Sequence, residues 1–406
     1  MKRRTFLQTT AAVPLLSAAG RRAWSQAPIK LGSIHDLSGL FDIYGKPMQD
    51  AVTLAVEEIN AEGGLLGRPI EPVVYDTQSN MALYTQYAQQ AALQDRVDVV
   101  HGGILSSSRE AMRPALRRFN TLYFYNTQYE GGVCDRNVFC TGVTPAQSVE
   151  ALIPYAMEQW GNKVYVLAAD YNYGQIISDW VKYYVQENGG EIVSTDFFPL
   201  DVSDFGSTIT RVQQAEPDFL VSALVGGAHL SFYRQWAAAG MKDRIPMAST
   251  TLGVGNEHVV LTPEEGNGIL LAYNYSKQLD NPENQAFLAA WAERFGEDSV
   301  ASVHELAVAT YQGIKLWAEG VRLAGSAERM AVIEALETGI SIQGPGGQIT
   351  VDPKTHHCIL DVHVLEVQDQ ELKVVKEFPQ QFPRDTAAVC DLEANPDDNT
   401  QYEIEV

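Results

Sequence analysis

The chain of 406 residues has little positive charge, few cysteines and no long apolar stretch. It contains 29 lysines and arginines against 51 aspartates and glutamates, which gives a formal net charge of −22 at pH 7. A surface with this excess of negative charge repels nucleic acid and anionic lipid head groups. We therefore expect neither of them to be a partner.

Motifs that carry enzyme chemistry or bind cofactors are also missing. The stretch 344–347 (GPGG) lacks the Lys-Ser/Thr pair of a phosphate-binding loop, and no Gly-x-Ser-x-Gly nucleophile elbow occurs. His304 and Glu305 begin a His-Glu-x-x-His zinc motif, but Val308 stands where the second histidine would be. We predict a protein that is not an enzyme, needs no cofactor and binds no metal.

The first 27 residues have the features of an export signal. The start, MKRRTFLQ, carries a twin-arginine pattern, and a mildly apolar stretch, 9–20, follows it. That stretch is shorter than the roughly 20 residues that a membrane span requires. We expect export by the twin-arginine route and removal of residues 1–27. Because this segment holds five basic and no acidic residues, the mature periplasmic protein would have a formal charge of −27.

The chain has four cysteines, Cys134, Cys140, Cys358 and Cys390. An even number in an exported protein fits two disulfide bonds, and three pairings are possible. We predict that each cysteine pairs with its neighbour in sequence, Cys134 with Cys140 and Cys358 with Cys390. Zinc is not predicted, because no Cys-x-x-Cys pair is present.

From Pro28 on, short apolar or β-branched runs alternate with longer segments of helical periodicity, which is typical of parallel sheets with crossover helices. The alternation restarts after Pro145. We predict an α/β fold of two doubly wound, parallel-sheet lobes joined by a hinge of several crossovers. The expected parts are a first lobe of residues 28–146 and 274–350, a second lobe of residues 147–273 and 351–380, and an acidic, irregular tail of residues 381–406.

Short motifs spread over most of the mature chain carry a family resemblance. The segments 31–39 (LGSIHDLSG) and 57–70 (EEINAEGGLLGRPI) resemble the opening of the type I periplasmic binding proteins, the leucine/isoleucine/valine receptors of ABC importers. The segments 104–109 (ILSSSR), 125–131 (YNTQYEG) and 170–173 (DYNY) resemble the branch that binds short-chain amides and urea. The resemblance implies a receptor that closes two lobes on a small polar solute and works with membrane permease subunits.

The candidate ligand-binding residues follow the ends of predicted strands. Side chains and helix N–H groups at the carboxyl ends of parallel strands face a common crevice. The candidate set is Leu105, Ser106, Tyr125, Thr127, Tyr171, Tyr173 and Gly226. The resemblance implies that Ser106 hydrogen-bonds the ligand carbonyl and that the other hydroxyls serve its amide group. The alternatives are a helix cap for Ser106, a core side chain for Tyr125 and an ordinary turn at Gly226.

One difference from the amino acid receptors bears on the ligand. Those receptors carry a carboxylate for the ligand ammonium in the segment that here reads ASTTLGVGN (248–256), which has no acidic residue. A buried ammonium without a counter-charge is costly. We therefore expect a neutral ligand, urea or a short-chain aliphatic amide. Three alternatives stay open: a branched-chain or other amino acid receptor with Asp170 as counter-charge, a periplasmic ligand sensor, and an amide hydrolase that uses Ser106.

Overall fold

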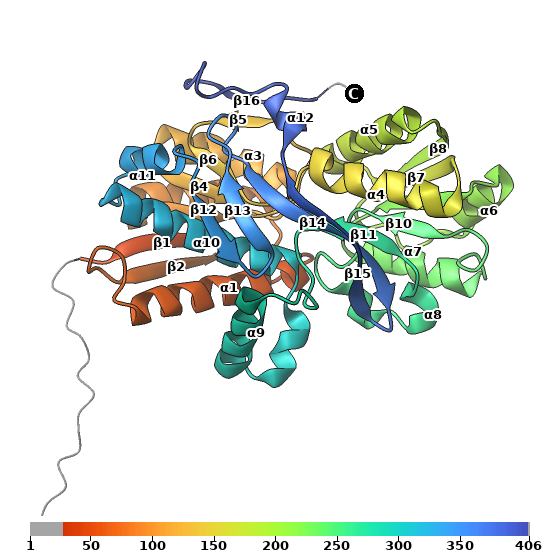
Figure 1. The fold of residues 1–406 in the computed structure, drawn as a ribbon, viewed down its shortest axis with the longest axis horizontal. Helices are drawn as coiled ribbons and strands as arrows, with labels where there is room; N and C mark the ends of the chain where they lie inside the picture. Colours follow the sequence, from red (N-terminus) through yellow and green to blue (C-terminus); the bar gives the residue numbers. More distant parts are fainter. Residues whose placement is uncertain (1–26, 405–406) are drawn as a thin grey trace, which may run out of the picture.

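The computed structural model describes residues 27–404, so residues 1–26 of the predicted export signal lie outside the described residues. Figure 1 shows two α/β lobes side by side, with the long strands β14 and β15 running between them. None of the helices in the described part of the chain is long and apolar enough to cross a membrane. The predicted fold class, two α/β lobes with parallel sheets, is confirmed.

The first lobe is built on a five-stranded sheet in the order β2-β1-β3-β4-β6, in which every pair is parallel. The four residues of β3 and of β4 are all buried, as expected for parallel strands that helices cover on both faces. The strands are β1 (Ile29–His35), β2 (Ile70–Asp76), β3 (Val99–Gly102), β4 (Leu122–Tyr125) and β6 (Val138–Cys140). The helices beside them are α1 (Asp42–Ala61), α2 (Met81–Gln90), α3 (Ser106–Arg118), α9 (Pro282–Phe295), α10 (Glu305–Ala324) and α11 (Arg329–Leu336).

The second lobe is built on a nine-stranded sheet. Its order is β12-β13-β14-β11-β10-β9-β7-β8, and β15 pairs with β14 on one side of this path. The strands are β7 (Lys163–Ala169), β8 (Glu191–Phe198), β9 (Phe219–Ala223), β10 (Met247–Ser249), β11 (Leu270–Tyr273), β12 (Ser341–Gly344), β13 (Gly347–Val351), β14 (Cys358–Gln368) and β15 (Glu371–Gln381). The helices are α4 (Pro145–Trp160), α5 (Asn172–Glu187), α6 (Gly206–Ala215), α7 (Gly227–Ala238) and α8 (Pro263–Gly266).

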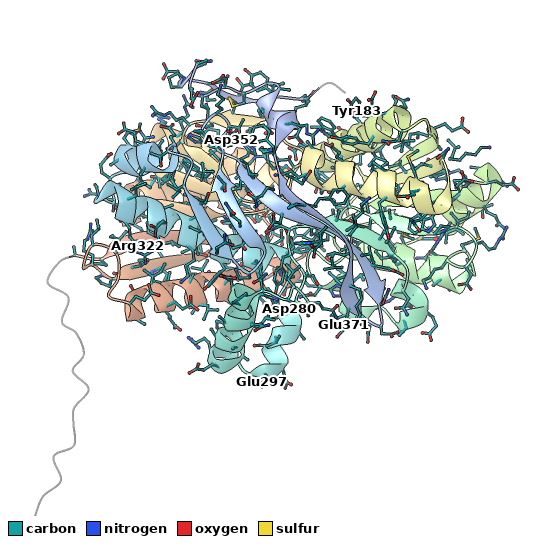
Figure 2. The ribbon with its side chains drawn as sticks, viewed as in Figure 1. Tyr183, Asp280, Glu297, Arg322, Asp352 and Glu371 are labelled. Carbon is teal, nitrogen blue, oxygen red and sulfur yellow. A yellow bond between two sulfur atoms is a disulfide. The ribbon has the colours of Figure 1, made fainter. Side chains whose placement is uncertain are left out.

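The segment after β11 returns to the first lobe, where α10 packs against α1 and α11 packs against α10. β12 and β13 lie at the border, because they pair into the second sheet through β14 while β12 also packs on α10. The residue boundaries of the two lobes therefore stay a prediction. Figure 2 places the exposed acidic residues Asp280, Glu297 and Glu371 in the lower middle of the view, near α9 and the start of β15.

The tail carries two short regular elements within an otherwise irregular segment. It forms α12 (Arg384–Ala387) and β16 (Asn399–Gln401), which pairs with β5 (Val133–Asp135). Arg113 and Arg117 of α3 donate to backbone carbonyls of the tail, and both also pair with the buried Asp135. Backbone carbonyls accept these bonds whatever the side chains are, which is why composition does not reveal the contact.

The predicted cysteine pairing is wrong. Cys134 is bonded to Cys390, with 5.4 Å between their Cα atoms, and Cys140 and Cys358 are buried free thiols. The reason is topological: Cys134 lies on β5, which pairs with the tail, whereas Cys140 lies on β6 in the main sheet. Cys140 and Cys358 belong to different core clusters and pack there as small apolar residues.

We expect reduction of Cys134–Cys390 to destabilise the protein, because the bond closes a loop of 256 residues in the unfolded chain. The expected loss in the free energy of unfolding is about 2–5 kcal/mol. It can be measured in urea with and without reductant. A double variant, Cys134→Ala with Cys390→Ala, should not respond to reductant. A Cys134–Cys140 peptide in a non-reducing digest would contradict the pairing.

Because several histidines are buried, we predict that the folded protein loses stability in mild acid. Burial lowers the pKa of His35, His101 and His357 to about 3, and that of His258 and His304 to about 4. In the unfolded chain these side chains take up protons below about pH 6.5. The free energy of unfolding should therefore fall as pH falls from 6.5 toward these folded-state values.

This pH dependence is measured best between pH 6.5 and 5, above the range in which ordinary carboxylates titrate. Glu305, whose pKa burial raises to about 8, acts in the opposite direction in this interval, but the folded-state pKa values of the five histidines all lie below that interval. Urea unfolding at several pH values provides the test. A free energy of unfolding that stays constant from pH 6.5 to 5 would contradict the prediction.

Candidate ligand-binding site

A cavity of about 50 Å³ lies between the two lobes. The first lobe lines it with Phe41, Tyr44, Ile104, Leu105, Ser106, Thr127, Gln128 and Leu306, and the second lobe lines it with Tyr171, Tyr173, Val225, Thr251 and Val254. Most of these residues follow the carboxyl ends of strands or begin helices. The cavity thus occupies the place where open parallel sheets bind their ligands.

Five of the seven predicted site residues line this cavity: Leu105, Ser106, Thr127, Tyr171 and Tyr173. The other two stand behind the wall. The Tyr125 hydroxyl donates to the carbonyl oxygen of Ile104 at 2.9 Å, so Tyr125 supports the loop before α3. Gly226 precedes α7 with φ of 62°, a left-handed backbone that favours glycine, and it faces the ring of Phe41.

Ser106 is placed by the turn between β3 and α3. It is the first residue of α3, and the first N–H groups of a helix have no carbonyl within the helix to bond. These groups, together with the helix dipole, favour an acceptor such as a carbonyl oxygen at this end of the cavity. The Ser106 hydroxyl itself donates to the carboxylate of Glu130, a residue that lies behind the wall.

Thr127 follows β4, and its hydroxyl donates to the carbonyl oxygen of Gly103 at 3.0 Å. Gly142 lies directly behind it. A Cβ atom at this glycine would stand 2.2 Å from the carbonyl carbon of Thr127. The loop that carries Thr127 therefore depends on the close approach of two backbones, which only glycine allows.

The two lobes touch across the cavity. The Gln128 side chain of the first lobe donates to the carbonyl oxygen of Thr250 in the second lobe at 2.8 Å. Tyr173 donates to the same oxygen at 3.2 Å. The Gln128 bond joins the two lobes, and the Tyr173 bond fixes its acceptor within the second lobe, so a molecule in the cavity would be surrounded on both sides.

Besides Glu130, the buried carboxylate of Glu257 lies near the cavity without lining it. Burial alone would raise the pKa of Glu257, but His229, 3.5 Å away, lowers it to about 2. The carboxylate also accepts from the backbone N–H of Gly253 at 2.8 Å. Tyr44, which lines the cavity, lies beside it, and the same burial raises the pKa of the Tyr44 phenol.

The sequence does not predict most of the apolar wall of the cavity, which includes Phe41, Val225, Val254 and Leu306. Apolar residues outside polar motifs cannot be told from core residues in a sequence. Gln128 did lie within a quoted motif, whereas Tyr44 lies outside the quoted motifs. Their roles follow from the contact between the lobes, which no sequence pattern shows.

Two α/β lobes with a small cavity between them are typical of solute-binding proteins. The chain belongs to the periplasmic binding protein family, which matches residues 28–371. This family consists of non-enzymatic, periplasmic solute-binding proteins of ABC transporters, which work with permease subunits. The prediction that the protein is not an enzyme is thereby confirmed.

Three similar proteins show what such relatives bind. A leucine-, isoleucine-, valine-, threonine- and alanine-binding protein of Pseudomonas aeruginosa is 24% identical over 349 residues, which are 84% of this chain and 90% of that protein. A solute-binding protein of R. palustris in complex with 4-hydroxybenzoate is 25% identical, with a TM-score of 0.79 and coverage of 88% and 98% of the two chains. The isoleucine complex of LivJ from Streptococcus pneumoniae is 22% identical, with a TM-score of 0.75 and coverage of 86% and 99%.

Proposed function

We propose that the protein binds urea or a short-chain aliphatic amide, after export by the twin-arginine route, and delivers it to the permease of an ABC importer. The volume of the cavity carries this proposal. A single water occupies roughly 10–15 Å³ on the same measure, so about 50 Å³ holds a ligand of a few non-hydrogen atoms. Urea and acetamide each have four such atoms, whereas leucine and 4-hydroxybenzoate are more than twice that size.

The chemistry of the wall supports the same class of ligand. Hydroxyl and amide groups of Ser106, Thr127, Gln128 and Tyr171 stand among aromatic and aliphatic side chains. A neutral amide needs only hydrogen-bond partners, and such a wall provides them without a buried ion pair. Aromatic and apolar groups exclude water, which makes each of these hydrogen bonds more selective.

A second candidate, an amino acid receptor, is favoured by Glu257. Its carboxylate is ionised, buried and separated from the cavity by Tyr44. Movement of the Tyr44 side chain would expose a counter-charge for a ligand ammonium. The relatives named for leucine, isoleucine and valine are consistent with this alternative.

A thermal-shift screen of the mature protein separates the two candidates. The ligands are urea, formamide, acetamide, leucine, valine and 4-hydroxybenzoate. A true ligand at a hundredfold excess over Kd stabilises the folded protein by about 2.7 kcal/mol, which raises Tm measurably. We expect a response to urea or the amides. A response to leucine or valine alone would favour the second candidate and reject the first.

Closure of the lobes provides a further prediction. The Gln128–Thr250 hydrogen bond joins the lobes only when they are closed, so we expect the lobes to separate in the ligand-free protein and to close on the ligand. Small-angle scattering should show a smaller radius of gyration when acetamide or urea is added at saturation. A radius that stays the same with a ligand confirmed by calorimetry would contradict hinge closure.

A further inference from the structure

The hydroxyl groups on the cavity wall share one hydrogen-bonding role. Most of them donate their proton to an acceptor of the protein: Ser106 to the carboxylate of Glu130, Thr127 to the carbonyl oxygen of Gly103, Tyr173 to that of Thr250, and Thr251 to that of Leu224. A hydroxyl has one proton and two lone pairs. What these groups can offer to a ligand is therefore a lone pair, which accepts a hydrogen bond.

For Ser106, an ion pair behind the cavity wall determines that its hydroxyl donates. Glu130 is 1% exposed, and its other carboxylate oxygen lies 3.1 Å from Nη2 of Arg109, which is fully buried. The Arg109 guanidinium also lies over the rings of Tyr125 and Tyr129, with its central carbon 5.0 and 4.5 Å from their centroids. One oxygen of this carboxylate accepts from Arg109 and the other accepts from the Ser106 hydroxyl, so Ser106 is the donor.

The loop that carries Glu130 is itself held in place. Gln401 of the tail accepts from Nη2 of Arg109 at 2.8 Å and donates to the carbonyl oxygen of Gly131 at 2.9 Å. The backbone N–H of Gly132 donates to the hydroxyl of Thr386 at 3.0 Å. The ion pair behind Ser106 is thus fixed from both sides, and its geometry does not depend on a ligand.

We propose that Glu130 is a positioning residue that determines specificity: by taking the proton of Ser106, it makes this part of the wall an acceptor for ligand N–H groups. The NH₂ group of an amide or urea meets lone pairs there, and its carbonyl oxygen takes the N–H groups at the start of α3. A ligand with a carboxylate of the same shape has no N–H proton to donate to the Ser106 oxygen, so we expect it to bind more weakly. The inference rests on the proposed function for the identity of the ligand, but not for the direction of the hydrogen bond.

The substitution Glu130→Gln tests this role. Its side-chain amide fills the same volume and can donate to the Ser106 oxygen, which frees the Ser106 proton to point into the cavity. Isothermal titration calorimetry would measure three pairs of ligands: acetamide and acetate, leucinamide and leucine, and 4-hydroxybenzamide and 4-hydroxybenzoate. Within a pair that binds, we expect wild type to prefer the amide and E130Q to shift the affinity ratio toward the acid by about tenfold or more.

Asp135→Asn is the matched control. It also neutralises a buried carboxylate paired with arginines of α3, but Asp135 does not line the cavity. D135N should leave the amide-to-acid ratio within about twofold of wild type. In an S106A background, E130Q should no longer shift the ratio, because the group through which it acts is gone. A shift in E130Q equal to that in D135N, or one that persists in S106A, would overturn the proposal.

Two outcomes separate this inference from the proposed function. If only the leucine or the hydroxybenzoate pair binds, the amide assignment fails, but the ratio within that pair still tests Glu130. A wild type that prefers the acid in the pair it binds would overturn the inference. If E130Q does not fold, S106A serves instead: it should weaken the amide by about tenfold and leave the acid nearly unchanged. Equal losses for amide and acid would count against the proposal.

Discussion

In calorimetric titrations with acetamide or urea, we expect T127A and S106A to bind roughly one to two decades more weakly than wild type. Each substitution removes a hydroxyl from the cavity wall and leaves a ligand N–H without its acceptor. An unsatisfied polar group in a closed site costs about 1–3 kcal/mol. The effect should appear in the dissociation constant and not in the stoichiometry.

The fold should survive both substitutions, because both side chains face the cavity. Thr310→Ala is a matched control: Thr310 is fully buried on α10, and its hydroxyl donates to its own helix, to the carbonyl oxygen of Leu306 at 2.7 Å. T310A should bind acetamide like wild type. If neither T127A nor S106A changes the affinity, the site is placed wrongly, and tight binding of leucine with no response to amides would refute the ligand class.

The parts of the fold that could be predicted are the helices and strands in which apolar residues recur with a clear period. Long helices such as α10 and buried strands such as β7 have enough residues for the apolar pattern to be recognised. β5, β6 and β10 have three residues each, which is too short for an apolar period to be recognised in the sequence. Helix starts with a cap are also recognisable in the sequence, as at α4, where Thr144 forms a capping box with Gln147.

The residues that line the candidate site could be predicted where hydroxyl chemistry and position at a strand end coincide. Ser106 and Thr127 follow strand ends in hydroxyl-rich motifs, and both line the cavity. Tyr125 has the same chemistry, but its hydroxyl bonds to the backbone behind the wall. Which hydroxyls face the ligand depends on the turn of each loop, and the ion pair of Arg109 with Glu130 depends on a contact between loop and helix.

The tail shows a different limit of prediction from composition. Its acidic, Asn-rich composition predicts an irregular segment, and composition does not record that Arg113 and Arg117 stand one helical turn apart facing it. The even number of cysteines predicts two bonds, but two of the thiols are core residues. Counting residues gives the number of possible bonds, whereas strand pairing between β5 and β16 determines which one forms.

The substitution Gly142→Ala is expected to weaken binding of acetamide or urea on the order of a hundredfold, although residue 142 does not touch the ligand. The new Cβ would stand 2.2 Å from the carbonyl carbon of Thr127 and 2.4 Å from the backbone nitrogen of Gln128. Contacts between carbon atoms have their optimum at about 3.5–4.0 Å, so the peptide between these residues must move. Both Thr127 and Gln128 would then leave their places in the wall.

Each displaced side chain loses a hydrogen bond worth about 1 kcal/mol, and the loss of the Gln128–Thr250 contact also removes a bond that holds the lobes closed. Gly227→Ala is the matched control, since a Cβ there would meet no atom within 4 Å and its backbone angle suits any residue. G227A should keep wild-type affinity and contract normally in scattering. G142A should remain folded by circular dichroism but show weak binding and no contraction at a ligand concentration that saturates wild type. Wild-type affinity in G142A would mean that the Thr127 loop is free to shift without consequence, and the cavity described above would then not be where the ligand binds.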